Sequence, residues 1–519
     1  THHYEANDKN DPRYLGHNSS KCDWVEDYDP SKHCKEFQKQ GRFTKEKIKG
    51  KIGNTFVESI KINGKPMFLC SKPGESDVFV SDKITVDEIN YIPASGLNPY
   101  DDYSFTLEEI TDLNQRKPTK ESVLEMLESQ IEYYIVASPF AKTLTTVDCM
   151  LSYCMEHIDT VHFPFYVGET ESGKSTCAHI FKNLGYRSLY SLDMTTANVY
   201  QFLGQDEEGQ GIIVEDEAQE MYKNAEKLRL YKGSYSRGSK IPRIVGADGH
   251  KRTQMIYLTF GLKVFAGEKL PYDKGFLERL AVVKMLEGVP KGNIKRLMPH
   301  EKSELEKIRK TCLFWKVQNF WIGLENIETG LQNRDQELWE DFLRVAYGTK
   351  FYQNASKVVQ YYKQQRHDSI KNSLEAKLLK IIIENMDENL EAQIQKIWEY
   401  ITSDANYILT GKQDGLQSFK LDEFADKLTI HKMVSIIKDK FHGRQIERTV
   451  KENHSYHQRS SYSFNSETLR KLVEKYDITI PSLDHPLYKG LKGPKSPNQL
   501  DPSDPLDAHI RCYYDQLRQ

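Results

Sequence analysis

The stretch from Phe163 to Cys177 constrains this chain more than any other. It reads Phe-Pro-Phe-Tyr-Val-Gly-Glu-Thr-Glu-Ser-Gly-Lys-Ser-Thr-Cys, an apolar run that stops at Gly168 and a Gly-Lys-Ser triplet that opens a helical pattern. A strand, a loop of the form Gly-x4-Gly-Lys-Ser and a helix together make a phosphate-binding loop. The spacing therefore predicts a nucleotide site in a fold of the α/β class.

The residue types of this loop suit ATP and Mg²⁺. Glycines let successive backbone N–H groups turn inward around the phosphates, and the helix N-terminus adds partial positive charge. Lys174 would reach the β- and γ-phosphates, and the Ser175 hydroxyl would bind Mg²⁺. The residues expected to surround the nucleotide are Gly168, Glu169, Thr170, Glu171, Ser172, Gly173, Lys174, Ser175 and Thr176.

A second element, Gly211 to Glu217, is a short apolar run that ends in three carboxylates about forty residues after the loop. Asp216 would hold the Mg²⁺ through water, and Glu217 would polarise the attacking water. Glu215 competes for that role, because the sequence does not fix the register of three adjacent carboxylates.

Bulk composition limits the possible partners and location. The 519 residues predict two to four domains. The net charge of −3 means that any surface for nucleic acid must be local. No apolar run approaches eighteen residues, no charged and apolar leader is present, and the eight cysteines form no CxxC pair. We therefore expect a cytoplasmic protein with no membrane partner.

Two strand-like runs, Ile241 to Val245 and Gln254 to Phe260, flank Gly246-Ala247-Asp248-Gly249, which is a strong turn signal. A solvated turn explains some of the basic residues around this expected hairpin, but their number beside a nucleotide site favours an anionic partner. These residues are Arg237, Lys240, Arg243, His250, Lys251 and Arg252.

Leu262 to Ala266 is expected to form the next core strand, and Arg279 stands directly before a further apolar run. The order of these elements resembles that in AAA+ replicative helicases. It is a phosphate loop, an acidic strand end, a basic hairpin, a core strand and then an arginine. The resemblance is to the superfamily 3 and minichromosome-maintenance type, including helicases of archaeal and bacterial mobile elements. It covers Phe163 to about Val283.

The resemblance implies a P-loop AAA+ ATPase that works as a homo-oligomeric ring, expected to be a hexamer, in DNA replication. In this family the hairpin before the sensor strand enters the central channel and grips single-stranded DNA, often with a Lys and a His that His250 and Lys251 match. Arg279 matches the arginine finger, which reaches a neighbouring subunit's nucleotide. The usual Asn or Thr after the sensor strand is missing, and Glu268 is a poor substitute for it.

The region after the core is expected to be helical. Arg334 opens an expected helix of the lid and is either a second sensor arginine or one partner of a surface ion pair. Two amphipathic segments after Leu374, a loop from Thr410 to Gln417 and helices at Leu421 to Leu428 and His431 to Phe441 follow. A hairpin from Ile446 to Phe464 and a helix from Ser466 to Tyr476 complete a pattern that resembles a winged helix.

This winged helix would bind either DNA or another protein. Its basic residues favour phosphate contacts, and those expected to bind nucleic acid are Arg444, Arg448 and Arg459. In the C-terminal tail, Ile510, Tyr513 and Tyr514 resemble a sliding-clamp-interacting peptide, with Asp507 in place of the usual Gln.

We therefore expect six parts. They are a polar tail, expected to be disordered (1–43), a β-rich accessory domain (44–117), the AAA+ core (118–300), an α-helical lid (301–372), a winged-helix domain (373–480) and a flexible tail (481–519). The function expected from this arrangement is an ATP-driven DNA helicase or translocase. The alternative is a replication initiator or loader that binds DNA and uses ATP to change state without unwinding. A small-molecule kinase is a poor alternative, because kinases with this type of loop rarely have an arginine at the position of Arg279.

Overall fold

The computed structural model describes residues 44–94, 103–204, 211–245, 253–271, 273–285, 287–403, 407–413, 416–421, 428–452 and 455–478, with residues 480, 485 and 487. The chain divides into two compact units, Thr1–Gln360 and Tyr361–Gln519. The expected N-terminal tail, His250, Lys251, Arg252 and the peptide of Ile510, Tyr513 and Tyr514 lie outside the described residues. The division into six parts stays a prediction.

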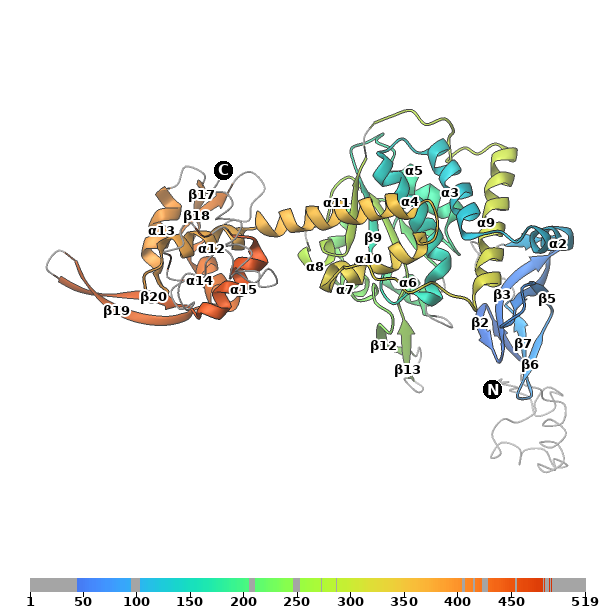
Figure 1. The fold of residues 1–519 in the computed structure, drawn as a ribbon, viewed down its shortest axis with the longest axis horizontal. Helices are drawn as coiled ribbons and strands as arrows, with labels where there is room; N and C mark the ends of the chain where they lie inside the picture. The colour runs from blue at the N-terminus through green and yellow to red at the C-terminus, as the bar shows by residue number, and fades with distance from the viewer. Residues whose placement is uncertain are drawn as a thin grey trace, which may run out of the picture. The chain divides into compact units, whose positions relative to one another are not determined.

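The described part of the first unit starts with β-structure, as expected (Figure 1). Its strands are β1 (Thr44–Lys47), β2 (Lys49–Ile52), β3 (Thr55–Ile62), β4 (Lys65–Ser71), β5 (Phe79–Ser81), β6 (Ile84–Val86), β7 (Ile89–Pro93) and β8 (Ser104–Phe105). One sheet has the order β2-β3-β4-β5, with β8 beside β3, and the other has the order β1-β7-β6. Asn63 and Gly64, with φ of 50° and 79°, form the tight turn between β3 and β4.

Helices α2 (Leu107–Arg116), α3 (Lys120–Tyr134) and α4 (Pro139–Leu151) connect these sheets to the central one, and the 3₁₀ helix η2 (Ser152–His157) follows α4. Each α-helix starts at a side-chain cap, because the hydroxyls of Thr106, Thr119 and Ser138 accept hydrogen bonds from backbone N–H groups in the first turn. Helix α4 continues directly into η2, so that the six residues before Ile158 are 3₁₀.

The central sheet contains β9 (Phe163–Val167), β10 (Leu189–Ser191), β11 (Ile213–Glu215), β14 (Lys263–Gly267) and β15 (Leu280–Lys284). All of its pairings are parallel, and the strand order is β10-β11-β14-β9-β15. Helix α5 (Lys174–Leu184) packs on β9, β11 and β14. Because the strands are parallel, the carboxyl ends of β9, β11 and β14 meet at one edge.

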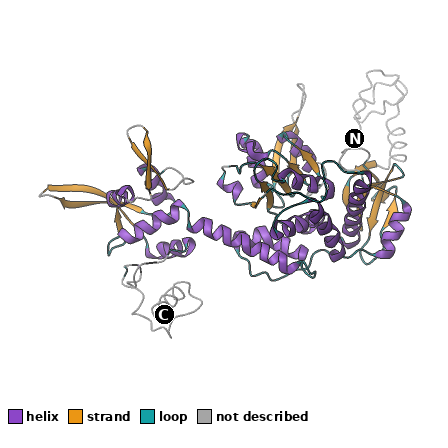
Figure 2. Ribbon diagram, turned by 90° about the horizontal axis from the view of Figure 1, so that it is seen from above, coloured by secondary structure: helices purple, strands orange, loops and turns teal. Residues whose placement is uncertain are grey.

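The remaining helices of the central region are α6 (Thr196–Leu203), the 3₁₀ helix η3 (Ala218–Lys223), α7 (Ala225–Gly233) and α8 (Lys274–Leu277). Strands β12 (Lys240–Val245) and β13 (Thr253–Leu258) form the expected hairpin, which projects from the body of the unit (Figures 1 and 2). Their register pairs Lys240 with Leu258 at the base and Val245 with Thr253 toward the tip.

Three long helices follow: α9 (Pro299–Asn319), α10 (Asn333–Ala346) and α11 (Tyr352–Lys371), the last of which crosses the boundary between the units. Helix α10 is held against the segment before β9. Asp341 Oδ2 accepts a 3.0 Å hydrogen bond from the backbone N–H of Asp159, and Trp339 stacks on the buried ring of His162. The helix thus has a fixed position beside the amino-terminal end of β9.

The second unit contains α12 (Leu374–Asn385), β16 (Glu391–Gln393), α13 (Ile394–Ser403), β17 (Tyr407–Gln413), β18 (Leu416–Leu421), α14 (Ile430–Asp439), β19 (Arg444–Glu452), β20 (Ser455–Ser463) and α15 (Ser466–Tyr476). Helices α12 to α15 and the long hairpin β19–β20 are where the sequence predicted them (Figure 1).

The expectation of a loop from Thr410 to Gln417 is wrong. Strands β17 and β18 pair as a hairpin with an irregularity between Leu409 and Gly411. A β-bulge accommodates the glycine that reads as a loop signal in the sequence. The helix expected at Leu421 to Leu428 falls mainly on 422–427, outside the described residues.

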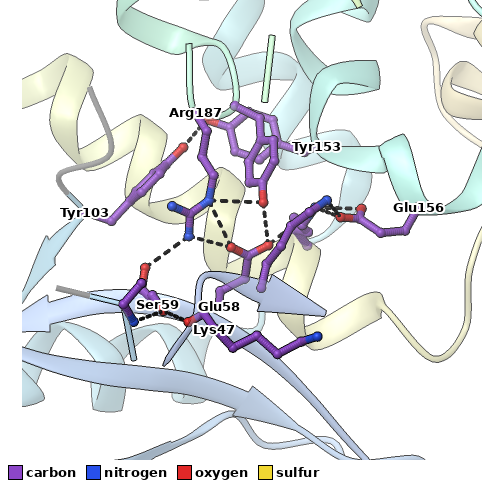
Figure 3. A network of polar contacts seen from close by, with 11 residues as sticks. Lys47, Glu58, Ser59, Tyr103, Tyr153, Glu156 and Arg187 are labelled. Atoms are coloured by element: carbon purple, nitrogen blue, oxygen red, sulfur yellow. Dashed lines mark hydrogen bonds and ion pairs between the residues drawn. The ribbon is translucent and has the colours of Figure 1, made fainter. Parts of the chain in front are cut away.

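A buried network of charges joins the β-rich part to the central sheet (Figure 3). The carboxylate of Glu58 on β3 accepts hydrogen bonds from Arg187 Nη2 at 2.7 Å and from the Tyr186 hydroxyl at 2.7 Å. Nearby, the carboxylate of Glu156 accepts from the ammonium groups of Lys49 and Lys316, each at 2.6 Å. Each carboxylate thus has a cationic partner, as buried charges require.

Within the described ranges, no helix combines the length and the apolar character that a membrane span requires.

Candidate functional site

The loop between β9 and α5 is a tight turn that needs its glycines. A Cβ atom on Gly168 would lie 2.4 Å from Ser172 Oγ and 2.9 Å from the carbonyl oxygen of Met285, so no larger residue fits. Gly173 caps α5 with φ of 86°. Glu171 also has a positive φ, 68°, which is a strained conformation for a residue with a side chain. The turn directs the start of α5 back toward the loop.

Lys174 lies inside this turn with only 7% of its surface exposed. Its ammonium donates a 3.1 Å hydrogen bond to the carbonyl oxygen of Glu169 and lies 3.9 Å from the carboxylate of Glu268. The Thr170 hydroxyl donates to the same carboxylate at 3.1 Å. The loop therefore holds its cation near the place where the sequence expects phosphate, and Glu268, which directly follows β14, faces it.

Ser175 and Asp216 lie together at the carboxyl edge of the sheet. The Ser175 hydroxyl donates a 3.2 Å hydrogen bond to Asp216 Oδ1, and the other carboxylate oxygen accepts from the Tyr190 hydroxyl at 3.2 Å. Burial and the charge of Asp216 raise the pKa of Tyr190, so that its hydroxyl keeps its proton. Hydroxyl and carboxylate oxygens are ligands that Mg²⁺ prefers, so this pair fits a magnesium site.

The two neighbouring glutamates have different environments. Glu215 is 2% exposed, forms an ion pair with Lys227 and accepts a 2.8 Å hydrogen bond from the Tyr231 hydroxyl. Burial raises its pKa, and these partners act against that rise. Glu217 is exposed, has φ of 58° and lines a cavity of about 580 Å³. Glu215 lines the same cavity, but its carboxylate is bound by Lys227 and Tyr231, so Glu217 is the exposed carboxylate of the two.

Arg279 and Arg334 converge on Tyr235, which neither the phosphate loop nor the hairpin pattern pointed to. Their guanidinium carbons lie 4.6 and 4.5 Å from the centroid of its ring. Arg334 also pairs with Glu337 at 2.6 Å, yet its side chain is only 13% exposed. Burial and the charge of Arg334 lower the pKa of Arg279. Two like charges this close favour an anion as their partner.

These arginines lie far from the phosphate loop of their own chain. Arg279 precedes β15, and its carbonyl oxygen accepts a 2.9 Å hydrogen bond from the backbone N–H of Phe163, the first residue of β9. The phosphate loop begins after Val167, at the other end of β9. At 3.3 Å per residue, the strand therefore separates the backbone of Arg279 from the start of the loop by about 13 Å. The two arginines are therefore at the amino-terminal edge of the sheet.

The structure gives Arg243, on the hairpin, partners within the protein. Its guanidinium contacts the carboxylate of Glu226 and the hydroxyl of Tyr200, and it lies 4.7 Å from the centroid of the Tyr200 ring. These partners come from α6 and α7, and no local pattern in the sequence links them to the hairpin. The role of Arg243 in binding nucleic acid stays a prediction that requires this ion pair to open.

In the second unit, Arg444 is exposed at the start of β19. Arg448 and Arg459 are directly opposite each other in the backbone register of β19 and β20.

No protein-family model matches the chain, and no curated protein matches it. Solved structures show weak likenesses. The apo C-terminal region of NrS-1 is 11% identical, with a TM-score of 0.33, over 79% of this chain and 97% of that one. A full-length MCM homologue from Methanopyrus kandleri is 10% identical, with a TM-score of 0.30, over 61% and 75%. JCV helicase is 11% identical, with a TM-score of 0.20, over 50% and 73%. These likenesses are too weak to establish a family, so any assignment of function depends on the site itself.

Proposed function

We propose that this protein is an ATP-driven DNA helicase or translocase of the AAA+ replicative type. The observation that carries the proposal is the set of Lys174, Ser175 and Asp216 at one edge of a parallel sheet. Strands β9 and β11 bring these groups together from separate segments. A phosphate loop with a carboxylate beside its hydroxyl is the arrangement that nucleotide hydrolysis in this class requires.

Each group has a role in hydrolysis. The ammonium of Lys174 binds the β- and γ-phosphates, and Ser175 and Asp216 hold Mg²⁺. The ion, when bound, neutralises charge on the phosphates. Glu217 accepts a proton from the attacking water, because it is the exposed carboxylate next to Asp216, whereas Glu215 is occupied by Lys227.

The arginines support a ring of subunits. Arg279 and Arg334 are at the sheet edge opposite the loop, so neither reaches the nucleotide of its own chain without a large rearrangement. We assign both to the γ-phosphate of a neighbouring subunit. Charges from a second chain would complete each site, as in a head-to-tail ring, which we expect to be hexameric.

Single-stranded DNA is the proposed partner in the channel of that ring. The hairpin β12–β13 projects from the unit that holds the loop, and the sequence places His250, Lys251 and Arg252 between its strands. In the second unit, Arg444, Arg448 and Arg459 on β19 and β20 give a winged-helix-like module a basic hairpin of its own.

A loader that changes state without unwinding is the second candidate. The contact of Arg243 with Glu226 and Tyr200 favours it, because that pairing leaves the hairpin with one fewer cation for DNA. The experiment that separates the two is ATPase activity with and without single-stranded DNA, together with unwinding of a forked duplex. A helicase shows stimulation and unwinding, both lost in Lys174→Ala. DNA binding with ATP turnover but no unwinding would establish the loader instead.

A further inference from the structure

A cavity of about 770 Å³ lies where the β-rich part, the base of the hairpin β12–β13 and the end of α9 meet. The cavity is on the side of the unit away from the phosphate loop, since Glu156 and His157 in its wall precede β9. Its volume suits a ligand of nucleotide size. Its lining includes Lys51, Phe56, Arg237, Lys240, Phe320 and Trp321.

Aromatic rings line one wall of this cavity. Phe320 stacks on Phe56 with 3.7 Å between ring centroids and 8° between their planes, and Trp321 meets Phe320 edge-on at 5.2 Å. Phe56 is fully buried, whereas Trp321 is partly exposed. The indole Nε1 has no hydrogen-bond partner among the described residues. These contacts hold a flat apolar surface in place, and the buried indole N–H beside it has no acceptor within the described part of the chain.

The cavity also carries uncompensated positive charge. The ammonium of Lys51 lies 5.0 Å from the centroid of the Trp321 ring. Lys51 and Lys240 are exposed, and within the described ranges no carboxylate is within ion-pair distance of either one. Glu156 lines the cavity, but its carboxylate is bound by Lys49 and Lys316. Arg237 donates to the carbonyl oxygen of Ile158 at 2.8 Å and lies 3.4 Å from the carboxylate of Asp159, so its charge is compensated.

The hairpin extends the cavity wall toward its tip. Lys240 and Leu258 face each other across the hairpin and line the cavity, and the next pair on the same face is Pro242 and Ile256. Ile256 is 59% exposed, which is high for an apolar side chain. One face of the hairpin therefore runs as an exposed, partly apolar track from the cavity toward the tip.

We propose that this cavity binds a base and the adjoining phosphates of single-stranded DNA, and that the strand continues along the Ile256 face of the hairpin. The inference deepens the proposed function and rests on it for the path of the strand. Aromatic rings receive bases by stacking, and ammonium groups beside them bind the backbone. A protein segment without acidic side chains would leave Lys51 and Lys240 without a charged partner.

The test measures binding of a fluorescently labelled oligothymidylate of ten nucleotides to the full-length protein. Fluorescence anisotropy is recorded without ATP over a series of salt concentrations. Lys51→Gln with Lys240→Gln should weaken binding about tenfold and reduce the salt slope by about 1.4, since each phosphate contact on a single strand contributes about 0.7. Trp321→Leu should weaken binding about tenfold, whereas Trp321→Phe, which keeps a stacking ring, should stay within about twofold of wild type.

The matched control replaces two exposed lysines outside the cavity, Lys83 and Lys302, with Gln. If this pair weakens binding as much as the cavity pair, or if both Trp321 variants bind like wild type, the inference is wrong. Competition by thymidine monophosphate as strong as by the oligonucleotide would also overturn it. The proposed function would be refuted by a different result, the absence of ATP turnover and unwinding in the wild-type protein. The binding measurement depends on neither activity.

Discussion

The carboxylate of Glu268 lies 3.9 Å from the ammonium of Lys174, across the space that the phosphate loop encloses. Glu268 directly follows β14, where the helicases that this sequence resembles carry Asn or Thr. Its side chain is 48% exposed and also accepts a hydrogen bond from Thr170. In the proposed function, the γ-phosphate of ATP competes with this carboxylate for Lys174, so that nucleotide binding would have to displace it.

Replacing Glu268 with Gln should tighten ATP binding by about twofold to fivefold, because an exposed ion pair contributes at most about 1 kcal/mol. The amide keeps the hydrogen bond to Thr170 but removes the negative charge. Isothermal titration calorimetry with ATP in magnesium buffer measures the change. The control is Glu88→Gln, an exposed glutamate in the turn between β6 and β7. Weaker binding by the Glu268 variant would mean that the carboxylate assists the nucleotide.

The register of the acidic run leads to a second prediction. Glu217→Gln should lower the rate of ATP hydrolysis at least about a hundredfold, the usual contribution of a general base, while ATP still binds. Its thermal unfolding should match wild type, because the side chain is exposed. Steady-state turnover and nucleotide retention are the measurements. Normal hydrolysis by this variant would refute the assignment.

Glu215→Gln should instead damage the fold. The substitution removes the buried charged partner of the Lys227 ammonium and leaves it only the exposed carboxylate of Asp193 at 3.5 Å, which should cost about 3 kcal/mol. Circular dichroism during heating should therefore show a clearly lower unfolding temperature. A variant that is as stable as wild type but inactive would give Glu215 the catalytic role instead.

Local patterns predicted much of the backbone of the candidate nucleotide site. The spacing of Gly168, Gly173 and Lys174 is enough to predict the loop, since one glycine is needed for close approach and another for positive φ. Strands β11, β14 and β15 are short apolar runs, and their buried positions follow from that composition. The hairpin β12–β13 follows from its glycine-rich turn.

Contacts between distant segments could not be predicted. Arg187 and Glu58 are 129 residues apart, and Thr170 and Glu268 are 98 residues apart. No periodicity in the sequence links such pairs, because tertiary packing alone brings them together. The convergence of two arginines on Tyr235 was missed for the same reason, although each arginine had been singled out alone.

The assignment of Arg279 and Arg334 to a neighbour's nucleotide can be tested by mixing subunits. Arg279→Ala and Lys174→Ala should each be inactive. Their equimolar mixture should regain about a quarter of the wild-type ATPase rate, since half of the subunits keep Lys174 and half of the neighbours keep Arg279. Arg334→Ala should complement Lys174→Ala in the same way. Full activity of a strictly monomeric protein would rule out the assignment.

The buried network predicts how stability depends on pH. Burial raises the pKa of Glu156, but the ammonium groups of Lys316 and Lys49 outweigh burial, so that the pKa lies below its ordinary value of 4.5. A lowered folded-state pKa stabilises the protein above pH 4.5, and this contribution is lost as the pH falls below that value. At pH 3.5 the loss should be about 1 kcal/mol.

Unfolding temperatures of the wild type and of Glu156→Gln between pH 7 and pH 3.5 test this. The variant should be less stable at pH 7, and the difference from wild type should shrink as the pH falls. Glu287→Gln, whose carboxyl is exposed, should keep the wild-type profile. If the difference in unfolding temperature between wild type and variant stays constant across this pH range, Glu156 is not ionised in the folded protein.

Mutation of the hairpin β12–β13 distinguishes a helicase from a loader. In the sequence, His250 and Lys251 lie between Val245 and Thr253, the last paired residues of the two strands. A tip of so few residues can contact one phosphate backbone, but it is too small to cover a duplex. Replacing both with Ala should abolish stimulation of the ATPase by single-stranded DNA and unwinding of forks. Basal ATPase activity should remain, because the phosphate loop is unchanged.

The same variant should keep its affinity for duplex DNA if Arg444, Arg448 and Arg459 supply that surface in the second unit. Its salt slope for single strands should fall by about 0.7 for each phosphate contact removed. Lys302→Ala, an exposed change on α9, is the control and should unwind like wild type. A helicase needs the tip in every stroke, whereas a loader can bind DNA through the second unit alone. Unwinding at the wild-type rate by the double variant would therefore exclude the channel hairpin and favour the loader.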